Sequence, residues 1–318
     1  MHPILFSIGD FFIGTYGLMI ALGLLAGIWV ASWRGRRRGF SSELFFDLAF
    51  VAVLSGFGGG RLLYILLNFS EFLSDPMAML LSRTGFVFLG GFVGAVGVVV
   101  WYLRRRGLPV LAVGDILAPS LAITHGFGRI GCHLAGCCWG SECSVPGLGL
   151  RLKLEEMPNG YPFSNAYLDQ IDRGLIPHDA VHSLPVWPVQ LMESAGLLLM
   201  AGALIWIAAR KPRPAGQILG LYLIGYAILR FGLEFLRGDA DRGMFFGGAI
   251  STSQLISLAL VPAGIVLLAK IRTNPPSPHS HPSVAPPPPG EKTEEKSGTE
   301  QEEPASSDAQ RIRRRRKR

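Results

Sequence analysis

The sequence predicts an all-α integral membrane protein, built as a seven-helix transmembrane bundle with a small extracytoplasmic cap. Of its 318 residues, 49% are hydrophobic and only 17% are charged, whereas an average globular chain carries about 25% charged residues. The apolar residues form long blocks without the spacing of an amphipathic helix, and Lys and Arg follow alternate blocks. These observations exclude most soluble folds.

Helices are expected where the apolar blocks are long enough to cross a membrane. A hydrocarbon core about 30 Å thick requires about 20 apolar residues per helix. Seven stretches come close to this length: 11–32, 44–67, 86–102, 110–135, 188–209, 216–236 and 251–271. Residues 1–10 contain no Lys or Arg, so we expect the first stretch to be a retained anchor and not a cleaved signal peptide.

The charges between these stretches predict their orientation, because Lys and Arg are retained on the cytoplasmic side. The connections after the first, third, fifth and seventh stretches are basic, with Arg34, Arg36, Arg37, Arg38, Arg104, Arg105, Arg106, Arg210, Lys211, Arg213, Lys270 and Arg272. By contrast, residues 140–187 carry three positive and six negative charges. We therefore expect an extracytoplasmic N-terminus, a cytoplasmic C-terminus and an extracytoplasmic Gly160.

We expect the membrane body to span residues 1–272. One segment within it and one segment after it should lie outside the apolar part. Residues 140–187 are long enough to fold as an extracytoplasmic cap, and long loops are often functional. Residues 273–318 hold nine of the 22 prolines and end in a basic run, which predicts a disordered cytoplasmic tail. The basic run could bind anionic lipid headgroups or nucleic acid. A solvated tail that reinforces the topology is favoured, and no nucleic-acid partner is expected.

Small residues predict where helices approach each other closely. Gly23 and Gly27 form a small-xxx-small pattern, and four glycines lie within residues 56–60. Such patterns let helix backbones pack tightly in a membrane. The second run lacks the strand–turn–helix context of a dinucleotide-binding loop, so we expect it to serve packing.

Ionisable residues inside the apolar stretches are candidates for function, because each is costly in a membrane unless it is paired. Tyr226, Arg230, Glu234 and Arg237 are spaced four, four and three residues apart, which predicts one shared helix face. Arg230 and Glu234 could simply neutralise each other, but one pair would suffice for that. Further cations in the second and fourth stretches leave a surplus of guanidinium groups. Guanidinium suits phosphate, so the pattern favours a phospholipid-handling site over plain helix packing.

Four cysteines fall within twelve residues, at positions Cys132, Cys137, Cys138 and Cys143, with His133 among them. Zinc accepts Cys and His ligands, but the usual C-x2-C pairing is missing and adjacent cysteines rarely bind one metal. An extracytoplasmic location would favour a disulfide, for instance from Cys132 or Cys137 to Cys143. Packing or a disulfide is favoured, a functional thiol stays open, and we assign no metal ligand.

Six short motifs occur in order along residues 10–270: Tyr16-Gly-Leu-Met, Gly60-Arg-Leu-Leu-Tyr64, Phe88-Leu-Gly-Gly91, Gly128-Arg-Ile-Gly131 with Trp139-Gly140, Pro188-Val-Gln-Leu-Met-Glu193, and the segment from Tyr226 to Arg237. With the number and orientation of the spans, they resemble the prolipoprotein diacylglyceryl transferase family. One such motif would be weak evidence, but six in order are strong.

The resemblance implies transfer of a diacylglyceryl group from phosphatidylglycerol to the lipobox cysteine thiol of a prolipoprotein. It implies a bacterial inner-membrane enzyme that needs no cofactor and whose partners are membrane lipids and lipobox signal peptides. Arg129 and Arg230 would hold the phosphate and stabilise its developing charge. Glu234 would orient Arg230, while Tyr16 and Tyr226 would position headgroup oxygens. The substrate-binding residues that it implies are Arg61, Arg129, Arg237, Gly140 and Gln190.

Three positions depart from the family pattern. Leu89 replaces a histidine often proposed as the base, Cys132 replaces an asparagine and Cys137 a glutamate. The acceptor thiol has an unperturbed pKa of about 8.5, so some group must promote its ionisation. His125, four residues before Arg129, or His133 could substitute, and we include His125 among the catalytic candidates. A structural histidine is the competing interpretation.

Three other functions remain open from the sequence. The chain could be a paralogue that moves a lipid-derived group to another acceptor. It could be a membrane thiol-redox protein that uses the cysteines, although the surplus arginines then have no explanation. The departures from the family pattern also leave room for a lipid-binding protein without catalysis.

Overall fold

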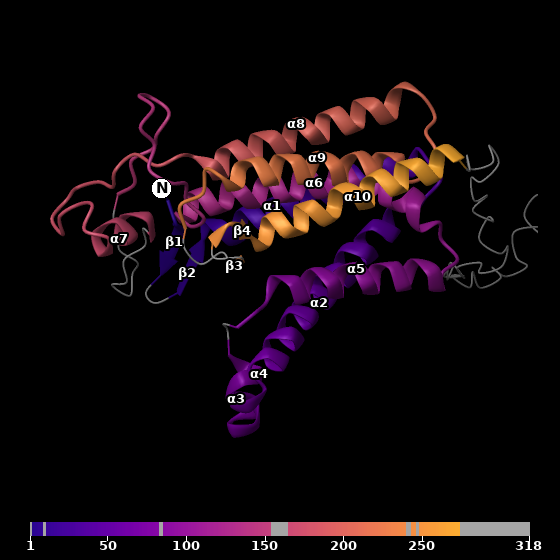
Figure 1. Cartoon of the computed structure of the whole chain (residues 1–318). Coiled ribbons are helices and arrows are strands. Elements are labelled where there is room, and N and C mark those ends of the chain that lie inside the picture. The colour runs from indigo at the N-terminus through magenta and orange to yellow at the C-terminus, as the bar shows by residue number, and fades with distance from the viewer. Residues whose placement is uncertain are drawn as a thin grey trace, which may run out of the picture. The chain divides into compact units, whose positions relative to one another are not determined.

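Long helices dominate the computed structural model, which describes residues 2–8, 11–82, 85–153, 165–239, 243–245 and 248–273. Seven of the helices within these ranges are long and apolar enough to cross a membrane (Figure 1). They are α1 (Thr15–Arg36), α2 (Ser42–Leu67), α5 (Phe88–Arg105), α6 (Val110–Ala135), α8 (Val189–Arg210), α9 (Gln217–Glu234) and α10 (Thr252–Thr273). The predicted class, an all-α membrane bundle, is confirmed.

Short elements lie in the connections between these helices. They are β1 (Ile4–Ile8), β2 (Phe11–Gly14), α3 (Phe69–Ser74), α4 (Pro76–Leu81), α7 (Asn165–Asp172), β3 (Met244–Phe245) and β4 (Ile250–Ser251). β1 pairs with β2 and β3 with β4, each antiparallel. Residues 154–164 of the predicted cap and residues 274–318 of the predicted tail lie outside the described residues.

Two predicted helix ends were wrong in ways that affect the site. The first helix begins at Thr15 and not at residue 11, because residues 11–14 form β2. The Thr15 amide and hydroxyl both donate to the Pro3 carbonyl, at 2.9 and 3.1 Å, and so tie the β1–β2 hairpin to the helix start. Helix α9, which corresponds to the sixth predicted span, ends at Glu234. Arg237 therefore follows this helix and does not extend its face.

Helix α6 lies at the centre of the bundle and packs against α1, α8 and α9, while α9 also packs against α10. Gly23 and Gly27 of α1 permit this contact, since a methyl group on either would meet α6. At Gly27 it would collide with the Thr124 side chain and lie 3.2 Å from the Ser120 carbonyl. The Thr124 hydroxyl donates to the Gly23 carbonyl at 3.0 Å. The predicted small-residue contact is confirmed.

Helices α2 and α5 form a closely packed pair (Figure 1). Glycines line both sides of their contact. A methyl group on Gly59 would strike the Gly90 carbonyl and lie 3.1 Å from the Gly94 Cα atom. The glycine run in residues 56–60 therefore serves helix packing, as predicted.

A buried arginine satisfies a carbonyl group that a proline inside α6 leaves without a donor. Pro119 lies inside this helix and has no N–H to donate to the carbonyl of Asp115, four residues earlier. The Arg34 guanidinium donates to the Asp115 and Ile116 carbonyls, each at 2.9 Å. The Asp115 carboxylate in turn accepts from the Gly216 and Leu219 amides at 2.9 and 2.8 Å, at the start of α9. Arg34 is thus a structural residue as well as one of the basic residues at a helix end.

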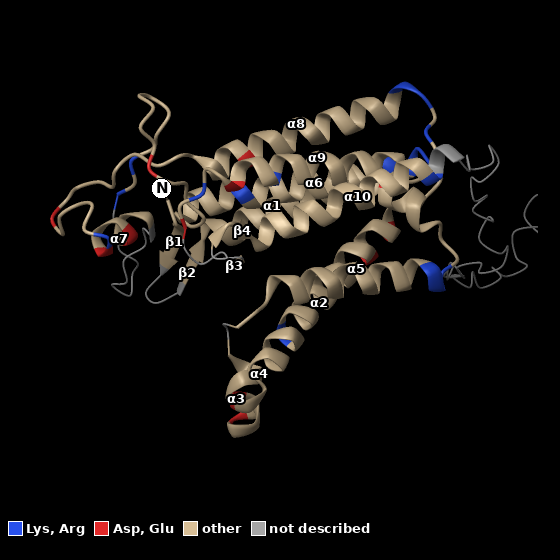
Figure 2. Cartoon of the chain, in the orientation of Figure 1, with Lys and Arg blue, Asp and Glu red and all other residues tan. Residues whose placement is uncertain are grey.

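Charge is unevenly distributed along the bundle. Figure 2 shows Lys and Arg gathered where α5 and α8 end, whereas acidic residues mark the α7 end. The α7 end carries a small apolar cluster of its own, formed by Trp139, Leu152, Ala166 and Val186. This polarity is what the charge pattern predicted, and the side of the membrane on which each end lies stays a prediction.

Candidate functional site

Polar residues converge where α1 and α8 begin and α6 and α9 end. The connection after α6 is tied to the connection after α9, because the Ser141 amide donates to the Leu236 carbonyl at 2.8 Å and the Gly238 amide to the Trp139 carbonyl at 3.1 Å. At the same end Gly131 of α6 packs against Tyr16 of α1. Residues that are far apart in the sequence therefore meet at one end of the bundle.

A buried carboxylate joins two candidates from α6. Glu193, only 3% exposed, places one carboxylate oxygen 3.1 Å from Nε of Arg129 and the other 3.6 Å from Nε2 of His125. His125 and Arg129 are four residues apart and thus share a helix face. Because one carboxylate serves both side chains, it fixes the Arg129 guanidinium at the end of α6.

A second buried ion pair lies on α9. Arg230 and Glu234 are 2.7 Å apart and nearly inaccessible, as the four-residue spacing predicted. The other terminal nitrogen of Arg230 donates to the Ser253 hydroxyl of α10 at 2.7 Å. The Tyr226 ring lies 5.4 Å from the His125 ring, and Tyr226 interacts electrostatically with Glu193, Arg230 and Arg129. Both ion pairs therefore belong to one polar cluster.

The segment after α9 adds a third arginine. Nε of Arg237 donates to Asp239 at 2.8 Å, and a second hydrogen bond joins the same two side chains. Burial alone lowers the pKa of Arg237, but the hydrogen bond to Asp239 and its negative charge raise the pKa above the ordinary value. Arg237 also forms a strand-like bridge with Gly140. A side chain at Gly140 would collide with the Trp187 carbonyl, so only glycine fits there.

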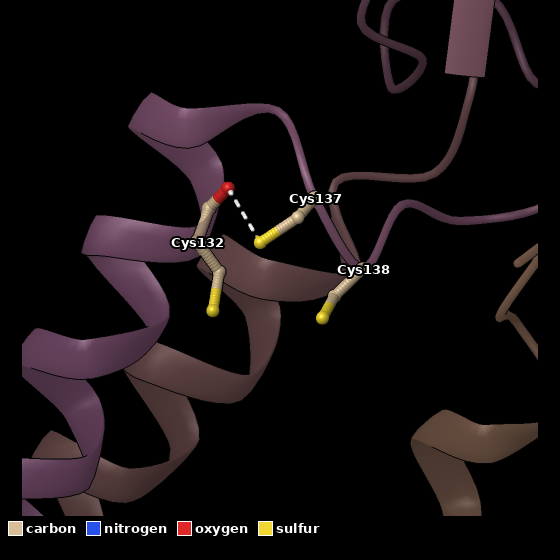
Figure 3. Close-up of side chains that lie close together, drawn as sticks. All are labelled: Cys132, Cys137 and Cys138. Atoms are coloured by element: carbon tan, nitrogen blue, oxygen red, sulfur yellow. Dashed lines mark hydrogen bonds between the residues drawn. The ribbon is translucent and has the colours of Figure 1, made fainter. Parts of the chain in front are cut away.

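The loop after α6 brings three cysteines together. Figure 3 shows Cys132, Cys137 and Cys138 with their sulfur atoms grouped at the helix end. The three Sγ atoms lie within 4.8 Å of one another, and the Cys137 thiol donates to the Cys132 carbonyl at 3.7 Å. The Gln190 amide holds the loop from α8 by donating to the Cys137 carbonyl at 2.9 Å. All four cysteines of the chain are free thiols in the structure.

Charged residues surround this group of thiols. Hydrogen bonding among the three thiols, together with the positive charges of Arg237 and Arg129, lowers the pKa of Cys138. The Tyr16 side chain, which is 43% exposed, interacts electrostatically with the same sulfur atoms and with Arg129. The thiols therefore belong to the same polar site as the arginines.

A sequence model of the family described as prolipoprotein diacylglyceryl transferase matches residues 3–270 of the chain. The chain belongs to this family. It is 35% identical over 265 residues to the phosphatidylglycerol–prolipoprotein diacylglyceryl transferase of Clostridium tetani, covering 83% of this chain and 96% of that protein. It is 36% identical over 275 residues to the protein of the same name from Vibrio cholerae, covering 84% and 90%.

Clostridium perfringens has a relative named phosphatidylglycerol–prolipoprotein diacylglyceryl transferase 2. This relative is 32% identical over 269 residues, which are 84% of this chain and 94% of that protein. All three relatives thus match this member of the transferase family over nearly their full length.

Most of the residues predicted for a transferase of this family meet at the site. The contacts described above join nine of them around the end of α6: Tyr16, His125, Arg129, Gly140, Gln190, Tyr226, Arg230, Glu234 and Arg237. Arg61 differs, because it donates to the Gly85 and Ser82 carbonyls at 2.9 and 3.0 Å, and also to that of Met79. It also lies over the Phe86 ring. Arg61 therefore holds the connection between α2 and α5.

Some residues at the site were not among the predicted ones. Glu193 was visible as an ionisable residue at the start of an apolar stretch, but its partners lie 64 and 68 residues earlier in the chain. Asp239 and Ser253 carried no sequence signal, since one lies in a polar turn and the other in a serine-rich helix start. Cys138 was seen, but not that its sulfur would approach Cys132.

The three positions at which the sequence departs from the expected pattern, Leu89, Cys132 and Cys137, differ in their surroundings. Leu89 lies in the first turn of α5, is 47% exposed and presents only carbon to its surroundings. Cys132 is buried, and Cys137 lies at the edge of the site. The two positions at which the resemblance implied an asparagine and a glutamate are thus two of the three grouped thiols.

Proposed function

We propose that the chain transfers the diacylglyceryl group of phosphatidylglycerol to the lipobox cysteine of prolipoproteins. The observation that carries this proposal is the convergence of Arg129, Arg230 and Arg237 at one end of the bundle. Tyr226 interacts electrostatically with all three. Each guanidinium is held by its own carboxylate, so the arginines are oriented before substrate binds.

The reaction needs charge stabilisation at the phosphate. The acceptor sulfur attacks the glyceryl carbon next to the phosphate, a carbon–sulfur bond forms, and the carbon–oxygen bond breaks with its electron pair staying on oxygen. Glycerol phosphate leaves with one more negative charge. In our proposal Arg129 and Arg230 bind the phosphate oxygens on which this charge develops, and one such donor is worth about 3–4 kcal/mol in comparable sites.

The other residues position these groups. Glu234 orients Arg230, and Glu193 orients Arg129. Tyr16 and Tyr226 hold headgroup oxygens, while Gln190 and Gly140 support the loop that carries the cysteines. Arg237 would contact substrate at the margin of the site. Arg61 lies in the connection between α2 and α5, and its contact with substrate stays a prediction. That His125 takes the acceptor proton stays a prediction, supported by its place between Glu193 and Tyr226.

The cellular setting forms part of the proposal. We infer that the arginine end faces the extracytoplasmic side of a bacterial inner membrane, because the basic connections lie at the other ends of the helices. Prolipoproteins with a lipobox signal peptide and membrane phospholipid would then reach the site from the same side.

Lipidation in cells depleted of their own enzyme tests the proposal. We expect the wild-type chain to restore lipidated prolipoprotein and Arg129→Ala or Arg230→Ala to reduce it at least about 100-fold. Cys143→Ser is the matched control, since Cys143 is buried and lies outside the group of three thiols. A wild-type chain that is present in the membrane but never lipidates a prolipoprotein would contradict the proposal.

A membrane thiol-redox protein is the second candidate, favoured by the three grouped thiols. It predicts that Cys137→Ser abolishes function while Arg230→Ala is tolerated, which is the reverse of the expectation for Arg230 above. Trapping a mixed disulfide between Cys137 or Cys138 and a client protein would support it.

A further inference from the structure

The sulfur atoms of Cys132, Cys137 and Cys138, called the thiol cluster below, have the geometry of an incomplete metal site. Because no two of them are more than 4.8 Å apart, some point lies within about 2.8 Å of all three, and zinc–thiolate bonds measure about 2.3 Å. Small side-chain rotations would close the difference. Soft thiolate ligands of this kind select zinc or copper(I) over the harder cations.

The backbone explains how two adjacent cysteines contribute to one cluster. Successive side chains of an extended chain point to opposite sides, so two adjacent cysteines rarely bind the same metal ion. Cys138 has a φ of +58°, in the left-handed region, and this turn redirects its side chain toward Cys132 (Figure 3). Such a conformation costs a non-glycine residue about 1–2 kcal/mol, a cost that metal coordination could offset.

We propose that the thiol cluster binds one zinc ion through three thiolates and that the acceptor cysteine of the prolipoprotein occupies the fourth position. The second half of this proposal rests on the proposed transferase function. Cys132 is buried, whereas Cys137 and Cys138 are partly exposed, so one side of the cluster faces outward. Three protein ligands with one open position are the arrangement of catalytic zinc sites.

The chemistry balances without a further reactant. Binding of zinc releases the three cluster protons to solvent. Coordination to the metal lowers the pKa of the acceptor thiol, and its proton passes to water or to the His125 imidazole proposed above. The resulting thiolate forms the carbon–sulfur bond while the carbon–oxygen bond breaks toward the phosphate. The thioether product is a weak ligand and leaves, which returns the open position.

Two features of this chain support the assignment. Leu89 lies in the first turn of α5 and has no group that could take a proton, so it cannot ionise the acceptor thiol, whereas zinc lowers the pKa of a coordinated thiol. Arg129 and Arg237 interact electrostatically with Cys138, and their positive charge favours a zinc–thiolate centre of net negative charge. The same arginines would bring the phosphate ester close to the coordinated sulfur.

Metal content of the purified full-length chain tests the first half of the proposal. We expect about one zinc per chain in the wild type and in Cys143→Ser, and a loss of roughly ten-fold or more in Cys132→Ser, Cys137→Ser and Cys138→Ser. Cobalt(II) loaded into the wild type should give thiolate-to-cobalt charge-transfer absorption, which needs no variant to fold. A wild type that binds neither ion, or cluster variants that retain zinc, would overturn the site.

X-ray absorption at the zinc edge tests the second half. Adding a lipobox peptide should raise the sulfur neighbours of zinc from three to four, and a peptide with serine at the acceptor position should not. An unchanged sulfur count with a bound peptide overturns the acceptor assignment.

Chelation separates this proposal from the proposed function. Removal of zinc should lower the lipidation rate roughly ten-fold or more, with recovery on adding zinc back. Undiminished lipidation by the zinc-free enzyme overturns the role of the metal but leaves the transferase function standing. Zinc binding without lipidation by any preparation supports the site and contradicts the transferase function.

Discussion

Glu193 is the residue on which the geometry around Arg129 depends. Its carboxylate is buried and serves both Arg129 and His125. Removing the charge with Glu193→Gln leaves a buried guanidinium without its counter-ion. We expect the lipidation rate to fall about 100-fold, by analogy with the loss of one oriented charge-stabilising group, measured in membranes that contain equal amounts of protein.

The control for this change is Glu142→Gln. Glu142 pairs with Arg173 at 2.7 Å, but both side chains are well exposed, and such surface pairs contribute only about 0–1 kcal/mol. Its lipidation rate should stay close to that of the wild type. Equal rates for the Glu193 and Glu142 variants would refute the role assigned to Glu193.

Single residues were predictable where their own chemistry was unusual. Arg129, Arg230 and Glu234 stood out because charge is costly inside an apolar stretch. Their partners were harder to predict. Arg230 and Glu234 lie about one helix turn apart, but Arg129 pairs with Glu193 of a different helix. The turn at Cys138 could not be predicted, because a left-handed cysteine has no sequence signal comparable to glycine.

At the scale of helices, the contact between α2 and α5 depends on glycine. Gly59→Ala would drive a methyl group against the Gly90 carbonyl, and overpacking of this kind costs about 1–3 kcal/mol. We expect a lower unfolding temperature for the detergent-solubilised protein. Gly58→Ala, where nothing lies within 4 Å of the added methyl group, should be neutral or slightly stabilising. A destabilised Gly58 variant and an unaffected Gly59 variant would contradict this packing.

Helix α6 offers a second test at this scale. Arg34→Ala removes the donor that Pro119 makes necessary at the Asp115 carbonyl, and a buried unsatisfied carbonyl costs about 1–3 kcal/mol. We expect a lower unfolding temperature for this variant than for Arg104→Ala, whose arginine is exposed at the end of α5. Equal unfolding temperatures would show that Arg34 does not stabilise α6 and contributes only positive charge at the end of α1.

The existence and number of the long helices were predictable from apolar length, but their ends were not. Hydrophobicity is the same whether Phe12 and Ile13 continue a helix or form a strand, so the β1–β2 hairpin was missed. The contacts of Thr15 with Pro3 decide where α1 begins, and these depend on the folded hairpin. Likewise, the residue spacing predicted that Arg237 lies on the same helix face as Arg230 and Glu234, although α9 ends at Glu234.

For the whole molecule, the charge pattern predicts the orientation of the bundle. Alkaline phosphatase, which is active only outside the cytoplasm, should be active when fused after Gly174 and inactive when fused after Arg213. A fluorescent protein that folds in the cytoplasm should give the opposite result at both positions. Phosphatase activity after Arg213 would reverse the orientation and would place the arginine site on the cytoplasmic side.

The most direct test of the central claim uses the purified chain in phosphatidylglycerol vesicles with a lipobox peptide. Mass spectrometry should show the peptide gaining one diacylglyceryl group on its cysteine, with an equal amount of glycerol phosphate released. Arg230→Ala should reduce both products together by about 100-fold. A peptide of unchanged mass, or lipid turnover that proceeds equally without the peptide, would contradict the assignment of the arginine site to this transfer.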